Sequence, residues 1–71
     1  MPNTSEIFKS LAVDARRDLL LAMVETDRTV QELTDVVSIG QSAVSQHLAN
    51  LKRSGMVRDR KVERHRYYSI C

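Results

Sequence analysis

The chain has 71 residues, a formal net charge of +2, one cysteine and two histidines. This length allows a single domain, 1–71, whose small core makes a partner subunit a plausible source of added stability. One cysteine excludes an internal disulfide and any multi-cysteine metal site, and no apolar run is long enough to span a membrane.

The N-terminal third predicts two helices after a loose end at residues 1–4. The first, Ser5–Leu11, would place three apolar residues on one side. Asp14 is a candidate N-cap for the second, which runs to about Glu25. Its inward residues would be Leu19, Leu20, Met23 and Val24. A polar turn, Glu25–Arg28, is expected to follow.

A helix, a tight turn and a second helix are expected next. Thr29 and Glu32 match a capping box, in which each side chain accepts a hydrogen bond from the other residue's backbone amide. The helix that they open should bury Val30, Leu33 and Val36 or Val37. Ser38–Gly40 forms the turn, and helix 40–54 should end where Gly55 supplies a left-handed residue.

Helix 40–54 has two unlike faces. An apolar stripe recurs at four- and three-residue spacing and consists of Val44, Leu48 and Leu51. The opposite side carries small and hydrogen-bonding residues but no carboxylate, namely Ser42, Gln46, Ala49 and Arg53, flanked by Ser45 and Asn50. Such a face suits base edges in a DNA major groove.

The segment beyond this helix is strongly basic. Two short strand-like runs, Met56–Val62 and Arg66–Ile70, surround a polar centre and predict a hairpin. Seven basic and two acidic residues lie between Lys52 and Arg66, about +5, while the rest of the chain carries about −3. A positive hairpin beside a polar helix is the charge pattern expected for phosphate contact.

Three stretches of this sequence resemble the ArsR family of bacterial repressors. LAVDARRDLLLAMVE is similar to the family's leading segment, QSAVSQHL with its following LKRSGMV to the family's reader unit, and DRKVERHRYYSI to its wing. The similarity covers roughly Phe8 to Ile70. It implies a winged helix-turn-helix fold and a dimeric regulator that binds DNA, closest to members that respond to redox or nodulation signals or have no known effector.

Four departures from the family pattern shape the expectations. The Cys-x-Cys pair of metal-sensing members is replaced by Thr29 and Gln31, and the thiol of redox-sensing members by Leu21. The wing turn, often Gly, has Glu63, and the chain stops at Cys71, where the family's C-terminal helix would begin. We therefore expect a short form without a metal site or cofactor and with an unknown effector. Its dimer interface would be formed by Ile7, Phe8 and Leu11.

Eight residues are predicted to contact DNA. On the helix, Gln46 can pair bidentately with adenine, the two serines suit phosphate or base edges, and Gln41 can share a phosphate with the helix amides. On the basic wing, 58–66, the arginines would meet the backbone or minor groove, and a merely solvated charge run is the alternative. The full set is Gln41, Ser42, Ser45, Gln46, Arg53, Arg60, Arg64 and Arg66.

The sequence thus predicts a mainly α winged helix-turn-helix domain with a small β-hairpin. Its expected function is to bind an inverted-repeat operator in double-stranded DNA as a homodimer, as a cytoplasmic transcriptional repressor. The alternative is a protein-interaction module of the same fold without DNA binding. No Gly-rich phosphate loop, nucleophile elbow or HExxH motif occurs, so we expect no enzyme.

Overall fold

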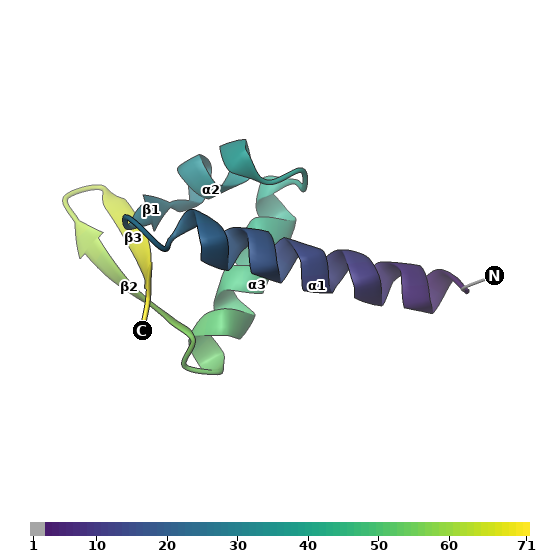
Figure 1. Cartoon of the computed structure of the whole chain (residues 1–71). Helices are drawn as coiled ribbons and strands as arrows, with labels where there is room; N and C mark the ends of the chain where they lie inside the picture. The colour runs from purple at the N-terminus through teal and green to yellow at the C-terminus, as the bar shows by residue number, and fades with distance from the viewer. Residues whose placement is uncertain (1–2) are drawn as a thin grey trace.

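The computed structural model describes the backbone of residues 3–71 and the side chains of all of these except Ile7, Phe8, Ser10 and Leu11. The expected dimer contact, Ile7, Phe8 and Leu11, therefore lies outside the described residues. Within residues 3–71 the elements follow in the order α1 (Thr4–Ala22), β1 (Arg28–Thr29), α2 (Val30–Val36), α3 (Gln41–Arg53), β2 (Val57–Val62) and β3 (His65–Ile70). The N-terminus of α1 and the sheet lie at opposite ends of the molecule (Figure 1).

The prediction of two helices before residue 25 is wrong, because α1 runs unbroken from Thr4 to Ala22. Its N-cap is Asn3, whose side chain accepts a hydrogen bond from the Glu6 amide at 2.9 Å, so residues 3 and 4 are not a loose end. Asp14 lies in mid-helix, with its carboxylate 3.6 Å from the Arg17 guanidinium one turn later. Neither Gly nor Pro occurs near Asp14, so nothing local interrupts the helix.

The C-terminal end of α1 comes earlier than predicted. Arg28 donates a hydrogen bond from Nε to the Ala22 carbonyl at 3.0 Å, which satisfies one of the free carbonyls at this helix end. Met23 is buried as expected, but Val24 lies beyond the helix and is 64% exposed. The turn that was expected up to Arg28 therefore ends in the short strand β1, because Arg28 and Thr29 pair with β3.

The helix-turn-helix prediction is confirmed by α2 and α3. The capping box forms as predicted: the Glu32 carboxylate accepts from the Thr29 amide at 2.9 Å, and the Thr29 hydroxyl accepts from the Glu32 amide at 3.2 Å. Of the two valines left open, Val37 is buried and Val36 is 57% exposed. The α3 helix ends at Arg53, and Gly55 follows with φ +80°, a left-handed conformation that favours glycine.

The sheet has the strand order β1-β3-β2, with both pairings antiparallel. In the hairpin, Val57 pairs with Ile70 and Val62 with His65, so a two-residue turn, Glu63 and Arg64, joins β2 to β3. Alternation along the strands gives the hairpin two faces. Val57 is buried and marks the face toward α3, which we call the inner face; Arg60 and its partner Tyr67 lie on the outer face.

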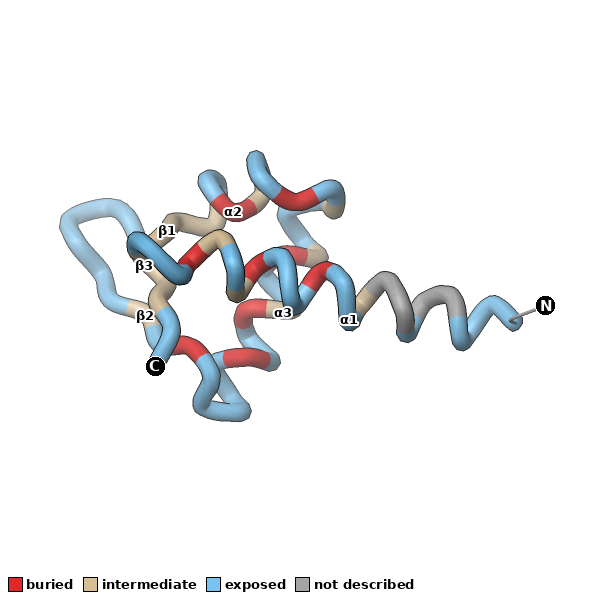
Figure 2. Tube along the Cα trace, in the orientation of Figure 1, coloured by how far each residue is buried: buried red, intermediate tan, exposed pale blue. Residues whose placement is uncertain are grey.

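The core lies where α1, α2, α3 and the sheet meet, as the buried positions in Figure 2 show. The predicted stripe of α3, Val44, Leu48 and Leu51, is fully buried in it. The core cluster is completed by Leu19, Met23, Leu33, Val37 and Val57. Of the two tyrosines, Tyr68 packs against this cluster, as expected for one member of an alternating pair. Among the described residues, no helix is both long enough and apolar enough to cross a membrane.

Candidate nucleic-acid interface

The outer face of α3 is polar, exposed and free of carboxylates. Burial of the apolar stripe turns the other side of the helix to solvent, so the predicted contact residues Gln41, Ser42, Ser45, Gln46 and Arg53 are all exposed. The N-cap, Gly40, provides no side-chain hydrogen bond, which leaves the first amides of α3 available to an external acceptor. The helix therefore offers amides, hydroxyls and one guanidinium to a ligand along a single side.

The tip of the hairpin carries an exposed cation. Arg64 is the second residue of the two-residue turn, and its side chain is exposed. The first, Glu63, has φ +57°, a left-handed conformation that costs a non-glycine residue energy. The predicted hairpin thus forms around a two-residue turn without glycine, and Arg64 in this turn is exposed.

The predicted contact residue Arg66 is held by an ion pair that the sequence does not reveal. The Asp59 carboxylate accepts from Arg66 Nη1 at 2.6 Å and lies 2.8 Å from Lys52 Nζ. The Asp59 side chain is only 8% exposed, whereas both cations are about half exposed. The hydrogen bonds from Lys52 and Arg66 hold the pKa of the Asp59 carboxyl below its ordinary value, and Asp59 in turn raises the pKa of Arg66.

Arg60, also a predicted contact, is engaged on the outer face of the sheet. Its guanidinium donates to Asp27 Oδ2 from Nε at 3.1 Å, with Nη2 3.0 Å from the same oxygen. The guanidinium carbon also lies 5.7 Å from the centre of the Tyr67 ring, within the range of a cation–π interaction. Arg60 and Arg66 therefore occupy opposite faces of the hairpin, each paired with an aspartate.

The ion pairs of Asp59 and Asp27 were missed in the sequence, where the two residues count only as acids among others. One signal was available for Asp59: alternation from the apolar Val57 places it on the inner face, toward α3. A carboxylate on that side of a basic strand needs a cationic partner. No local pattern links Asp27 to Arg60, because they are 33 residues apart.

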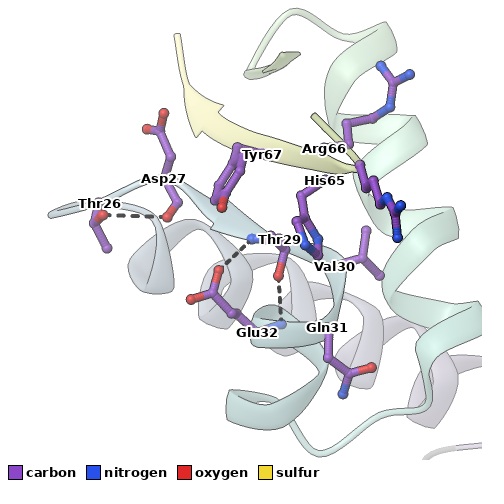
Figure 3. A pocket seen from close by; sticks show the side chains of 10 residues that line it. Thr26, Asp27, Thr29, Val30, Gln31, Glu32, His65, Arg66 and Tyr67 are labelled. Atoms are coloured by element: carbon purple, nitrogen blue, oxygen red, sulfur yellow. Dashed lines mark hydrogen bonds between the residues drawn. The ribbon is translucent and has the colours of Figure 1, made fainter. Parts of the chain in front are cut away.

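A shallow groove of about 650 Å³ separates the start of α2 from the hairpin (Figure 3). Thr29 and Gln31, which stand where metal sensors carry their cysteine pair, line it together with Arg64, His65 and Tyr67. The Glu32 carboxylate is engaged in the capping box, and the Thr29 amide lowers its pKa. In the described part of the chain, no three His, Cys, Asp or Glu side chains come close enough to hold a metal ion.

The described residues form three helices followed by a basic hairpin. The last of these helices, α3, is the second helix of the helix-turn-helix and has an exposed polar face. This arrangement defines the winged helix-turn-helix class. Residues 14–59 match the profile of the bacterial regulatory proteins of the arsR family, and the chain belongs to that family.

Relatives agree with this assignment. Transcriptional activator HlyU of Vibrio cholerae is 34% identical over 90% of this chain and 59% of its own length. HTH-type transcriptional repressor SmtB of Mycobacterium tuberculosis is 35% identical over 93% of this chain and 49% of its own. The chain thus spans about half to three fifths of these curated relatives.

A solved structure matches the fold closely. The homodimeric winged helix-turn-helix DNA-binding domain Mb0332 of Mycobacterium bovis, described as a possible ArsR-family regulator, superposes with a TM-score of 0.77. It is 26% identical, and the match covers 93% of this chain and 61% of that one. The predicted fold class is therefore confirmed.

Proposed function

We propose that this chain is a sequence-specific, double-stranded-DNA-binding domain of a transcriptional regulator. In this proposal α3, within helix 40–54, reads the major groove, and the wing, 58–66, contacts the backbone and minor groove. Gln46 pairs with a base edge, Ser42 and Ser45 contact bases or phosphates, and Gln41 and the free amides of α3 hold a phosphate.

One observation carries the proposal: an exposed helix face without carboxylates lies beside a hairpin rich in cations. A solvated helix needs no such one-sided composition, whereas a carboxylate that faced the DNA backbone would be repelled by the phosphates. Of the predicted cations, Arg53 lies at the end of α3 and Arg64 at the wing tip, and both are exposed. Arg60 and Arg66 are each paired with an aspartate, which offsets part of their positive charge.

We further propose that the protein acts as a homodimer on an inverted-repeat operator. Support comes from the Mb0332 neighbour, a homodimer, and from two-fold symmetry, which would place two α3 helices about 34–36 Å apart in successive major grooves. Repression is the proposed outcome, in line with SmtB, although HlyU is named an activator. Its site of action is then the cytoplasm, it has no enzymatic activity, and it needs no metal or cofactor.

Fluorescence anisotropy with a random-sequence duplex tests DNA binding directly. We expect saturable binding at low salt that weakens steeply as salt rises, because phosphate contacts release counterions. Selection from a random pool should then enrich an inverted repeat, and sedimentation should give two chains for each bound site. Absence of binding at low salt would favour the alternative, a winged-helix protein-interaction module. A reporter placed behind the selected operator would distinguish repression from activation.

A further inference from the structure

The ion-paired cluster of Lys52, Asp59 and Arg66, called here the Asp59 triad, joins the reader helix to the wing. Lys52 belongs to the last turn of α3, Asp59 to β2 and Arg66 to β3. The two cations are separated by 14 residues in sequence, but the same carboxylate binds both. The triad is therefore a direct polar connection between the end of α3 and the hairpin.

The triad also borders the surface proposed to meet DNA. Ser45, Ala49 and Lys52 follow each other at four- and three-residue spacing, so Lys52 lies in the same row of the helix as a predicted contact. Arg66 lies two residues beyond Arg64, the tip of the wing. A helix in the major groove and a wing at the next minor groove flank one sugar–phosphate strand, so the DNA complex proposed above would place Lys52 and Arg66 next to that strand.

A buried carboxylate at this place opposes phosphate binding. Asp59 is 8% exposed and lies within 3 Å of both cations, while Lys52 and Arg66 are 53% and 52% exposed. The cations thus keep an open side toward solvent, and the aspartate stays behind them. The triad carries a net charge of +1, whereas the same two cations without Asp59 would carry +2.

We propose that Asp59 is a positioning residue that aims Lys52 and Arg66 at one DNA strand and, as their internal counter-ion, limits the sequence-independent attraction of the protein to phosphate. The proposal rests on the DNA-binding function proposed above. It assigns to Asp59 a role in setting affinity that differs from simple support of the fold. A purely structural aspartate would change stability but not the number of counterions released on binding.

Asp59→Asn tests the proposal, because asparagine keeps the shape and one acceptor oxygen but removes the charge. Random-sequence affinity is measured against salt for the wild type and the variant. The slope of log K against log salt should steepen by about 0.9, the value for one additional neutralised phosphate. If both proteins converge at 1 M salt, the variant binds about fourfold more tightly at 200 mM and about fifteenfold at 50 mM.

Asp14→Asn is the matched control. It makes the same charge change at a carboxylate of α1 that pairs with Arg17, neither of which belongs to the predicted DNA contacts. We expect it to change the slope by less than half as much as Asp59→Asn. Equal changes in the two variants would overturn the proposal, because net charge alone would then explain the effect.

Arg66→Gln provides a second route that keeps the carboxylate paired with Lys52. It should flatten the slope by about 0.9, and the double variant Asp59→Asn/Arg66→Gln should return to the wild-type slope. A double variant as steep as Asp59→Asn would overturn the proposal. Circular dichroism before each titration confirms that the variants are folded. If Asp59→Asn is unfolded, Arg66→Gln remains as the test, and an unchanged salt slope in this variant would overturn the proposal.

The outcomes separate this inference from the proposed function. Binding by the wild type with an unchanged slope in Asp59→Asn overturns the inference and leaves DNA binding in place. Absence of binding by both proteins at low salt overturns the proposed function and the inference together. If only Asp59→Asn binds DNA, the result supports the proposed function and the inference, because Asp59 then limits the attraction to phosphate more strongly than expected.

Discussion

Single side chains on α3 and the wing are expected to contribute differently to DNA binding. Gln46 is an uncharged amide on the exposed face of α3, and Arg64 is a cation at the tip of a turn. An amide can distinguish bases by donor and acceptor pattern, whereas a guanidinium at the backbone attracts every sequence alike. The distinction can be measured by comparing an operator with a random-sequence duplex.

Gln46→Ala should weaken operator binding by about 1–3 kcal/mol and leave random-sequence affinity nearly unchanged. Competition titrations on the selected operator measure both quantities. Gln31→Ala is the control, since Gln31 is an exposed amide of α2 whose side chain bonds Asp35 at 3.1 Å. Equal loss on both duplexes in Gln46→Ala would contradict its assignment as a base reader.

Arg64→Ala should weaken binding to all sequences alike and flatten the salt slope by about 0.9, because one phosphate contact is lost. Anisotropy titrations at several salt concentrations measure the slope. Lys9→Ala, which removes an exposed cation from the N-terminal half of α1, should leave the slope unchanged. A change in operator affinity without a change in slope would mean that Arg64 reads bases instead.

Asp59 also predicts how stability responds to acid. Its pKa in the folded protein lies below the ordinary value of 3.8 because Lys52 and Arg66 bind the charged carboxylate. The stabilisation is therefore fully present above about pH 4 and is lost as the pH falls through the lower, folded-state pKa. Urea unfolding between about pH 2 and pH 6 measures this effect. The free energy of unfolding should fall less with decreasing pH in Asp59→Asn than in the wild type. An identical dependence in both proteins would argue against the triad.

The secondary-structure elements owe their ends to local hydrogen bonds and turn residues. Thr29 with Glu32 begins α2, Asn3 with Glu6 begins α1, and Gly55 allows the chain to leave α3. The hairpin is the exception, since Glu63 takes a left-handed conformation without being glycine. This element therefore contains strain that a substitution can relieve.

Glu63→Gly should raise the free energy of unfolding by about 1 kcal/mol, because glycine adopts positive φ without a steric penalty. Arg64→Gly at the neighbouring turn position is the control. Among the described non-glycine residues only Glu63 has positive φ, so Arg64→Gly adds flexibility to the unfolded chain without relieving strain and should lower stability. Both are measured by urea unfolding without DNA. A stabilising Arg64→Gly would show that the gain does not come from Glu63's backbone.

At the scale of the whole molecule, a domain of 71 residues has a small reserve of stability, about 4–10 kcal/mol at the usual value per residue. The core cluster brings together residues from α1, α2, α3 and β2. Loss of packing in α3 should therefore unfold the protein as a unit instead of loosening only the reader helix.

Val44→Ala should lower the free energy of unfolding by about 2–3 kcal/mol through lost apolar burial and the cavity that remains. Val36→Ala is the matched control: it makes the same chemical change at a residue that is 57% exposed, against 0% for Val44, and should cost less than about 0.5 kcal/mol. Thermal and urea unfolding measure both. Similar losses at the two positions would show that the core is packed differently.

Much of this protein follows from short-range pattern. The buried stripe of α3, the Thr29 capping box, the left-handed Gly55 and the hairpin all depend on residues a few positions apart, so their spacing predicts them. The exposed face of α3, with Gln46 at its centre, follows from the same periodicity. These features were sufficient to predict the winged helix-turn-helix fold and the surface proposed to bind DNA.

What the tertiary structure alone decided depends on residues far apart in the chain. The Asp14 side chain suits a helix cap as well as an ion pair, and only the complete α1 shows that it forms the pair. The strand β1 exists because β3, some forty residues later, supplies its hydrogen bonds. Likewise, composition predicts the net charge of the wing but not which of its cations are paired. Folding brings Asp59 to Lys52 and Arg66, and so determines which cations remain open to phosphate.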